Sequence, residues 1–121
     1  MIRFKELTRS LRHAARGIWV VYQTEQSFRI QMFAAVIVVI GAIGFRISSG
    51  EWKLILLLIS AVLVLELVNS VFERIIDTFK PRLHPAVRDM KDMMAAAVLV
   101  VSLVALVIGL LIFIPYLARL F

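Results

Sequence analysis

Three long apolar segments constrain the fold of this chain more than any other feature. They cover about residues 28–46, 53–78 and 88–115. A helix needs about 20 apolar residues to cross the roughly 30 Å hydrocarbon core of a bilayer, and the segments are close to that length or longer. Because backbone N–H and C=O groups find no partners in hydrocarbon, segments that span it must be helical. We therefore predict an all-α membrane protein with three transmembrane helices.

The composition agrees with this class. Of the 121 residues, 62% are hydrophobic, which is too many for a soluble domain of this size. The length suits one unit, so residues 1–121 are predicted to form a single integral membrane domain. The absence of cysteine excludes disulfides and thiolate metal sites. A net charge of +6 could suggest nucleic acid, but the basic residues gather at segment ends, which favours an anionic membrane surface.

A basic segment precedes the first span. In residues 4–24, apolar side chains recur at helical spacing, and basic side chains occupy much of the remaining surface. An amphipathic helix of this kind, with Trp19 and Tyr22 near its end, suits the headgroup layer. We expect it to lie flat on the membrane; packing against a neighbouring subunit is the alternative.

Two turns separate the three spans. The first is expected at RISSGEWK, residues 46–53, with Gly50 as the helix breaker. The second is expected at KPRLHP, residues 80–85, because each of its prolines disfavours helical geometry in the residue before it. The third span is expected to stop at Pro115.

The placement of lysine and arginine predicts the orientation. The segment before the first span and the loop between the second and third spans are both strongly basic, and such segments face the cytoplasm. The other loop holds only Arg46 and Lys53, and the tail only Arg119. With three spans, the N-terminus is predicted to be cytoplasmic and the C-terminus outside.

Four polar side chains lie close together around the second span. At about 100° per residue, Glu66, Glu73 and Asp77 fall within roughly 40° of one another. Asn69 lies about 60° to the side. Counted from Leu54 at about 1.5 Å per residue, Glu66 is about 18 Å in, just past the bilayer middle. A carboxylate there costs at least about 2.5 kcal/mol on insertion scales, so we interpret this helix edge as a buried functional site.

Other charged residues are expected at the cytoplasmic end of this edge. Glu25 precedes the first span at that height, and the turn after the second span folds Arg88 and Lys91 back toward it. Glu25, Glu73 and Asp77 would repel one another without a cation, and oxygen ligands at a phosphate-handling site favour Mg²⁺. Lys91 and Arg88 are placed to neutralise phosphate oxygens. The residues alone therefore predict an acidic, metal-dependent site, and they do not by themselves show kinase chemistry. Neither common glycine-rich phosphate loop occurs, so a bound nucleotide would not be held by a familiar loop.

Four short sequence motifs occur in the chain between residues 14 and 98. E-x-x-N-S-x-x-E-x-x-x-D runs from Glu66 to Asp77, and K-D-x-x-A-A-A-V runs from Lys91 to Val98. Upstream are A-A-R-G-I at residues 14–18 and T-E-x-x-F at residues 24–28. Together they cover nearly the whole chain, which resembles the prokaryotic diacylglycerol kinase family, including its undecaprenol kinases.

This resemblance implies a fold and an activity. The fold is a surface helix plus three transmembrane helices, assembled as a homotrimer with active sites between subunits in the bacterial inner membrane. The activity is transfer of the γ-phosphate of MgATP to the hydroxyl of a membrane lipid, either diacylglycerol or undecaprenol. The partners implied are therefore ATP, the lipid alcohol and further copies of the chain.

The resemblance also implies roles for individual residues. Glu66 is similar to the general base that accepts the proton of the lipid hydroxyl, and Asn69 to a residue that supports it. Glu25 and Glu73 resemble ligands of the divalent ion, Mg²⁺, that bridges the ATP phosphates. The other matching positions resemble nucleotide contacts: His84, Lys91 and Asp92.

The chain departs from the family pattern at some positions. Gln31 stands where one branch has an acidic residue, so the resemblance implies no extra metal role there. T-E-x-x-F and the His84–Pro85 pair favour the undecaprenol kinase branch slightly. The natural lipid and the role of Asp77 stay open.

Three other interpretations compete with a lipid kinase site. Carboxylates within a membrane also serve proton- or cation-coupled transporters, but here every acidic group except Glu51 lies at or inside the middle, toward the cytoplasm. A non-catalytic scaffold gives no reason for polar groups aligned on one helix. Alternatively, Glu25 and Glu73 are simple interfacial carboxylates paired with Arg29 or Arg74.

Overall fold

A computed structural model describes residues 1–79 and 85–121 of the chain. This part consists of four helices and contains no strand: α1 (Phe4–Thr24), α2 (Gln26–Phe45), α3 (Ser49–Phe79) and α4 (Pro85–Ala118). The helices α2, α3 and α4 are long and apolar enough to cross a membrane. The prediction of an all-helical membrane protein with three such helices is therefore confirmed.

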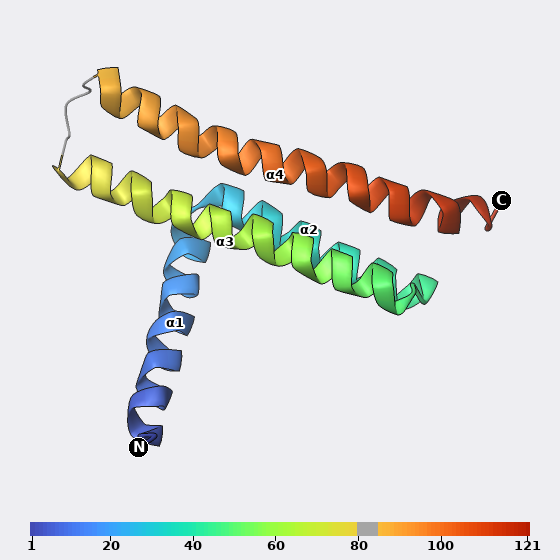
Figure 1. Ribbon diagram of the computed structural model, residues 1–121, viewed down its shortest axis with the longest axis horizontal. Coiled ribbons are helices and arrows are strands. Elements are labelled where there is room, and N and C mark those ends of the chain that lie inside the picture. The colour runs from blue at the N-terminus through green and yellow to red at the C-terminus, as the bar shows by residue number, and fades with distance from the viewer. Residues whose placement is uncertain (80–84) are drawn as a thin grey trace.

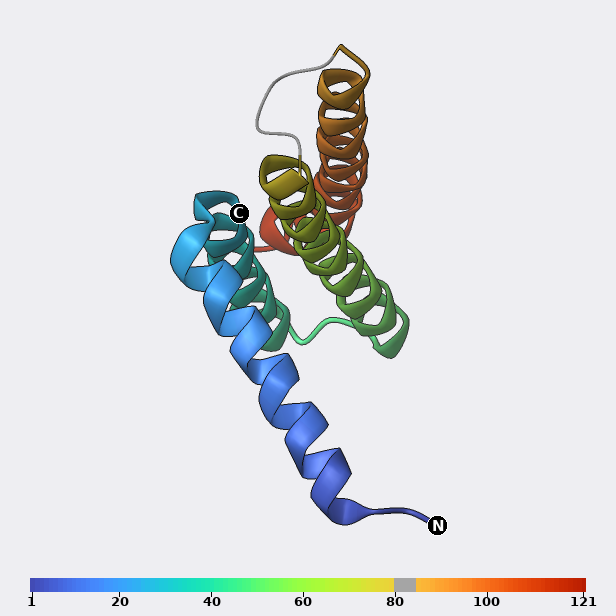
Figure 2. The ribbon, with the colours of Figure 1, turned by 90° about the vertical axis from the view of Figure 1, so that its left-hand side faces the viewer.

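The three apolar helices run side by side, and α1 projects away from them (Figure 1). The helix α3 packs against both α2 and α4, and α1 reaches α2 and α3 near its C-terminal end. Seen from one end, α2, α3 and α4 form a small bundle with α1 leaving from the side of α2 (Figure 2). Most apolar side chains on these helices are exposed in the single chain, as expected of surfaces that meet lipid or another subunit.

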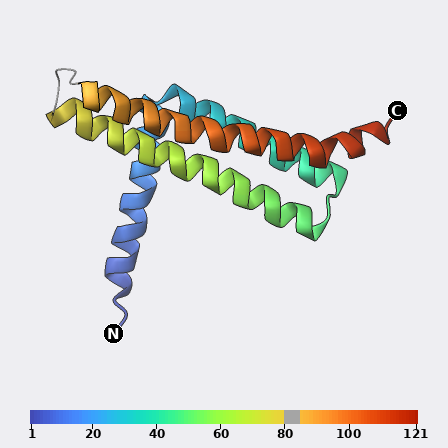
Figure 3. The same cartoon turned by 45° about the horizontal axis from the view of Figure 1, so that its top comes forward.

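The buried apolar core lies at the end of the bundle where α2 turns into α3. It consists of Ala42, Ile47, Ile55 and Ile112, and aromatic side chains from all three helices pack against it. The C-terminal end of α4 runs alongside this turn (Figure 3). Tyr116 donates a hydrogen bond to Glu51, which joins the last turn of α4 to the first turn of α3.

Two predicted helix boundaries are wrong. Gly50 is not the breaker of the first turn, since it lies within the first turn of α3. Instead, α2 ends where Arg46 adopts a left-handed conformation, with φ of 54°. The α3 helix then begins after Ser48, whose hydroxyl accepts a bond from Glu51 N–H at 3.2 Å while the Glu51 carboxylate accepts one from Ser48 N–H at 3.0 Å. This reciprocal capping box has the signature S-x-x-E, which is present in the sequence.

The other wrong boundary is the end of the third span. The α4 helix continues through Pro115 to Ala118. A proline removes one N–H donor from a helix, but here only three helical residues follow it, so little of α4 depends on that bond. The residues beyond it are held by Tyr116, which packs on the core and bonds Glu51. The second predicted turn, KPRLHP, lies outside the described residues except for Pro85, which opens α4 at the position where proline is favoured.

The capping box yields a stability prediction. Ser48→Ala removes the hydroxyl that accepts the Glu51 N–H, and loss of such a cap costs about 1 kcal/mol in free energy of unfolding. Denaturant titration of the protein in detergent micelles measures this change. Ser49→Ala is the matched control, because this neighbouring serine has no capping bond; an equal loss in both variants would contradict the capping role.

Candidate functional site

One edge of α3 is turned into the protein and carries polar groups. Glu66 and Ser70 are buried on it, with 6% and 2% of their surface exposed. Val62 and Ile76 continue the same edge before and after them and are also buried. The first three residues are four apart and Ile76 follows six later, so at about 100° per residue all four fall within an arc of about 120° on one face of the helix. Within the single chain, the predicted edge is thus buried at Glu66, half-buried at Asn69 and Glu73, and exposed at Asp77.

Glu25 lies against this edge from the junction of α1 and α2. It is the one residue between the two helices, with extended φ and ψ of −113° and 112°. Its Oε1 accepts a hydrogen bond from Ser70 Oγ at 3.2 Å. The carboxylates of Glu25 and Glu73 are both close enough to repel Glu66 electrostatically. Three acidic side chains from two parts of the chain thus gather at one place.

None of these three carboxylates is neutralised by a nearby cation within the described part of the chain. The ion pairs found there are Arg3–Glu6 and Lys91–Asp77. The predicted alternative, in which Arg29 or Arg74 pairs with Glu25 or Glu73, is not observed. Both arginines instead bond residues of the α1–α2 junction: Arg74 donates to Thr24 at 2.6 Å, and Arg29 donates to backbone carbonyls.

The carboxylate oxygens at this edge are ligands of the kind that a divalent cation prefers. Mg²⁺ takes oxygen ligands and is usually held by one or two carboxylates plus substrate phosphates, which matches Glu25 and Glu73. Within residues 1–79 and 85–121, no three acidic or histidine side chains are arranged to hold a metal by themselves. The set of Glu25, Glu73 and Asp77 inferred from the residues alone is therefore not assembled, because Asp77 pairs with Lys91.

Asn69 has an unsatisfied polar atom beside this edge. Its Oδ1 is buried and has no hydrogen-bond partner among the described residues. A buried amide oxygen left without a partner costs free energy, so such atoms call for an explanation. A substrate or water donor at this point would satisfy it, which agrees with the supporting role that the resemblance implies for Asn69.

Lys91 reaches the Asp77 end of the edge from α4. Its Nζ lies 3.3 Å from Asp77 Oδ1, so the predicted return of α4 toward Asp77 is observed. Asp92 and Arg88 are exposed on the same turns of α4. His84, the remaining predicted nucleotide contact, lies outside the described residues.

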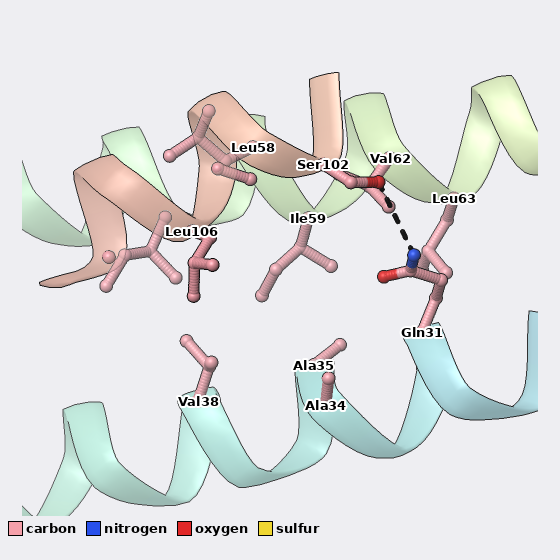
Figure 4. A pocket seen from close by; sticks show the side chains of 13 residues that line it. Gln31, Ala34, Ala35, Val38, Leu58, Ile59, Val62, Leu63, Ser102 and Leu106 are labelled. Carbon is pink, nitrogen blue, oxygen red and sulfur yellow. Dashed lines mark hydrogen bonds between the residues drawn. The ribbon is translucent and has the colours of Figure 1, made fainter. Parts of the chain in front are cut away.

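A cavity of about 220 Å³ lies deeper in the bundle, between α2, α3 and α4 (Figure 4). It is lined almost entirely by apolar side chains, including Val62 and Leu63, which precede Glu66 by one turn of α3. The exception is a polar pair at one end, where Gln31 donates to Ser102 Oγ at 3.4 Å. Gln31 therefore contacts α4, and nothing in its contacts gives it a metal role.

Sequence reasoning gave no role to three polar residues that the fold brings to the site. Ser70 stands within the motif that begins at Glu66 but has no predicted role there. Arg29 and Arg74 are predicted only as possible ion-pair partners of Glu25 and Glu73. The signal that points to them is spacing: Ser70 and Arg74 are four residues apart on α3 and so lie on one face. The height of Glu25 relative to that face is set by the α1–α2 junction, which sequence spacing alone does not locate.

These features define a class: a multi-pass helical membrane protein with a carboxylate site buried at one end of its bundle. The family described as prokaryotic diacylglycerol kinase matches residues 12–113. The chain belongs to this family and is a lipid kinase. The transporter and scaffold alternatives are thereby excluded as its primary activity.

Named relatives agree with this assignment. The chain is 39% identical to the undecaprenol kinase of Bacillus subtilis (strain 168), over 88% of its own length and 87% of the relative's. It is 30% identical to the diacylglycerol kinase of Synechocystis sp. (strain ATCC 27184 / PCC 6803 / Kazusa), over 83% of the chain and 58% of that protein. A diacylglycerol kinase of Helicobacter pylori (strain ATCC 700392 / 26695) is also 30% identical, with 80% and 76% covered.

Proposed function

We propose that this lipid kinase transfers the γ-phosphate of MgATP to the hydroxyl of undecaprenol or diacylglycerol at the cytoplasmic face of the bacterial inner membrane. The observation that carries the proposal is that Glu66 is buried on the inward edge of α3, with Glu73 on the same helix and Glu25 at the α1–α2 junction both near enough to repel it. Higher identity to the undecaprenol kinase than to the diacylglycerol kinases favours undecaprenol as the first lipid to test.

In this mechanism, Glu66 accepts the proton of the lipid hydroxyl. The hydroxyl oxygen then forms a bond to the γ-phosphorus as the bond from that phosphorus to the β–γ bridging oxygen breaks, which leaves phospholipid and ADP. Glu66 is suited to this because its carboxylate is buried on a helix that is apolar enough to span the membrane, at the level where a lipid alcohol would react. Asn69, whose Oδ1 is buried without a hydrogen-bond partner among the described residues, supports the site, and its amide N–H is the group that could donate to the attacking oxygen.

The phosphate end of the site lies nearer the water. Glu25 and Glu73 would hold Mg²⁺ there, and the ion when bound neutralises charge on the transferred phosphoryl group. Lys91, Asp92 and His84 contact the nucleotide. Lys91 is held beside Asp77, so its ammonium group is already ordered at this height before a phosphate binds. Positioning and neutralisation of this kind supply most of the catalysis in phosphoryl transfer.

The active assembly in this proposal is a homotrimer, and α1 lies on the cytoplasmic surface of the membrane. Exposed apolar side chains on α2, α3 and α4 leave surface for contacts between subunits. The basic and apolar residues of α1, all but a few of them exposed, support its place in the headgroup layer. The basic segments support a cytoplasmic N-terminus and site, with the C-terminus outside.

A direct phosphorylation assay tests the proposal. Purified protein in mixed micelles receives γ-labelled ATP and Mg²⁺, with undecaprenol and diacylglycerol offered separately. We expect label in the phosphate ester of at least one lipid, with undecaprenol the better acceptor. Micelles without either alcohol are the control, and a failure of both lipids to gain label would refute the proposed reaction.

A further inference from the structure

The α1–α2 junction places Glu25 without help from regular helical geometry. Glu25 is extended, so neither helix by itself fixes the direction of its side chain. Its N–H still bonds Val21 O at 2.8 Å, which anchors the backbone to the end of α1. The carboxylate, however, extends toward α3, and its position must come from contacts made there.

Two side chains of α3 supply such contacts. Ser70 Oγ donates to Glu25 Oε1 at 3.2 Å, and Arg74 Nη2 donates to Thr24 Oγ1 at 2.6 Å. Ser70 and Arg74 are one helical turn apart, so they lie on one face of α3 and bond two successive residues, Glu25 and Thr24. From α2, Arg29 holds the preceding carbonyls of Tyr22 and Gln23, at 2.8 and 3.0 Å.

The partners in this arrangement leave Glu25 without an ion pair among the described residues. Ser70 is a neutral donor and uses part of the accepting capacity of a carboxylate that has about four lone-pair sites. Arg74 is cationic but bonds the Thr24 hydroxyl and forms no ion pair with Glu25 or Glu73. Ser70 thus holds the carboxylate directly, Arg74 holds the residue before it, and neither contact places a cation on Glu25.

We propose that Ser70 and Arg74 are positioning residues that hold Glu25 in place for the divalent ion. This inference rests on the proposed function, in which Glu25 is a metal ligand. Partners that orient a ligating carboxylate typically change metal affinity by about 10- to 100-fold when they are lost. Because each contact here is a single hydrogen bond, we expect the lower end of that range.

The test measures Mn²⁺ binding in place of turnover. Electron paramagnetic resonance follows Mn²⁺ binding to the full-length protein with a non-hydrolysable ATP analogue. We expect Ser70→Ala and Arg74→Met each to raise the Mn²⁺ Kd by about tenfold. Ser60→Ala is the matched control on α3, since its hydroxyl bonds only the carbonyl of Leu57. Wild-type Kd values in both Ser70→Ala and Arg74→Met would overturn the proposal.

A further variant removes the bond between Arg74 and Thr24 by changing the residue on α1. Thr24→Val removes the acceptor of the Arg74 bond and should match Arg74→Met, with no further loss when the two are combined. Thr24 also bonds the carbonyl of Val20, so Thr8→Val, which loses the equivalent bond to Phe4 at the other end of α1, is its control. Additive effects in the double variant would show that the two residues act separately.

Amide hydrogen exchange separates positioning from general loosening. In the metal-free protein, Arg74→Met and Thr24→Val should speed exchange at residues 22–25 and leave the α3–α4 contact around residues 49–55 unchanged. Equal acceleration in both regions would refute a positioning role.

The failure of the proposed reaction and the failure of the positioning inference can be told apart. If the wild type binds Mn²⁺ yet labels no lipid, the proposed reaction fails while the junction contacts keep their role. If lipid is labelled but Ser70→Ala and Arg74→Met bind Mn²⁺ normally, only the positioning inference fails.

Discussion

Replacing Glu66 with glutamine should lower kcat for lipid phosphorylation by about 10²- to 10⁴-fold, the usual contribution of a general base. Glutamine keeps the size and shape of the side chain, which matters at a position with only 6% of its surface exposed. It cannot accept the proton of the lipid hydroxyl. The affinity for nucleotide should change little, because Glu66 lies on the lipid side of Glu73. Steady-state kinetics and separate nucleotide titration measure the two quantities.

Loss of folding does not explain such a result, since this substitution should not destabilise the protein. Glu66 is repelled by Glu25 and Glu73 and has no ion-pair partner within the described residues. Removing its charge should therefore leave the melting temperature unchanged or raise it. Ser60→Ala, an exposed polar substitution on the same helix, should keep full activity. Wild-type kcat in Glu66→Gln would exclude this residue as the base.

The helical architecture followed from the sequence because long apolar runs permit few alternatives. The first helix occupies residues 4–24 as predicted, and α2 is Gln26–Phe45 against an expected 28–46. The two wrong boundaries are the start of α3 and the end of α4, and each depends on a few hydrogen bonds. The Ser48–Glu51 capping box moves the start of α3 ahead of Gly50, and the bond from Tyr116 to Glu51 holds α4 beyond Pro115. Tyr116 and Glu51 are 65 residues apart, so no local pattern reveals their contact.

The site was predictable only in part, for a related reason. Helical periodicity places Glu66 and Ser70 on one edge, and the apolar run around them makes that edge a conspicuous one. What periodicity cannot supply is the direction in which α1 leaves the bundle, which depends on the extended geometry of Glu25. That direction decides that Arg74 meets Thr24 and not a carboxylate. The predicted cluster of Glu25, Glu73 and Asp77 is not found among the described residues, and Asp77 pairs with Lys91 of α4.

Replacing Glu73 with glutamine should lower activity at a fixed Mg²⁺ concentration by at least about 100-fold. Loss of a residue that merely orients a ligand costs about 10- to 100-fold, and loss of the ligand itself should cost no less. Mg²⁺ sites in phosphoryl transfer use one or two carboxylates, so Glu25 alone retains a weakened site. Activity should therefore recover in part as Mg²⁺ is raised, and a titration of rate against Mg²⁺ measures the shift.

The shape of that titration distinguishes Glu73 from Glu66. A lost metal ligand moves the Mg²⁺ midpoint upward, whereas a lost base lowers the plateau and leaves the midpoint where it was. Removal of Mg²⁺ by a chelator should abolish wild-type activity, and readdition should restore it. Glu6→Gln, which removes an exposed carboxylate of α1, is the control and should keep the wild-type midpoint. A Glu73→Gln variant with the wild-type midpoint would remove Glu73 from the metal site. A plateau reduced alone would place it with Glu66 on the lipid side of the reaction.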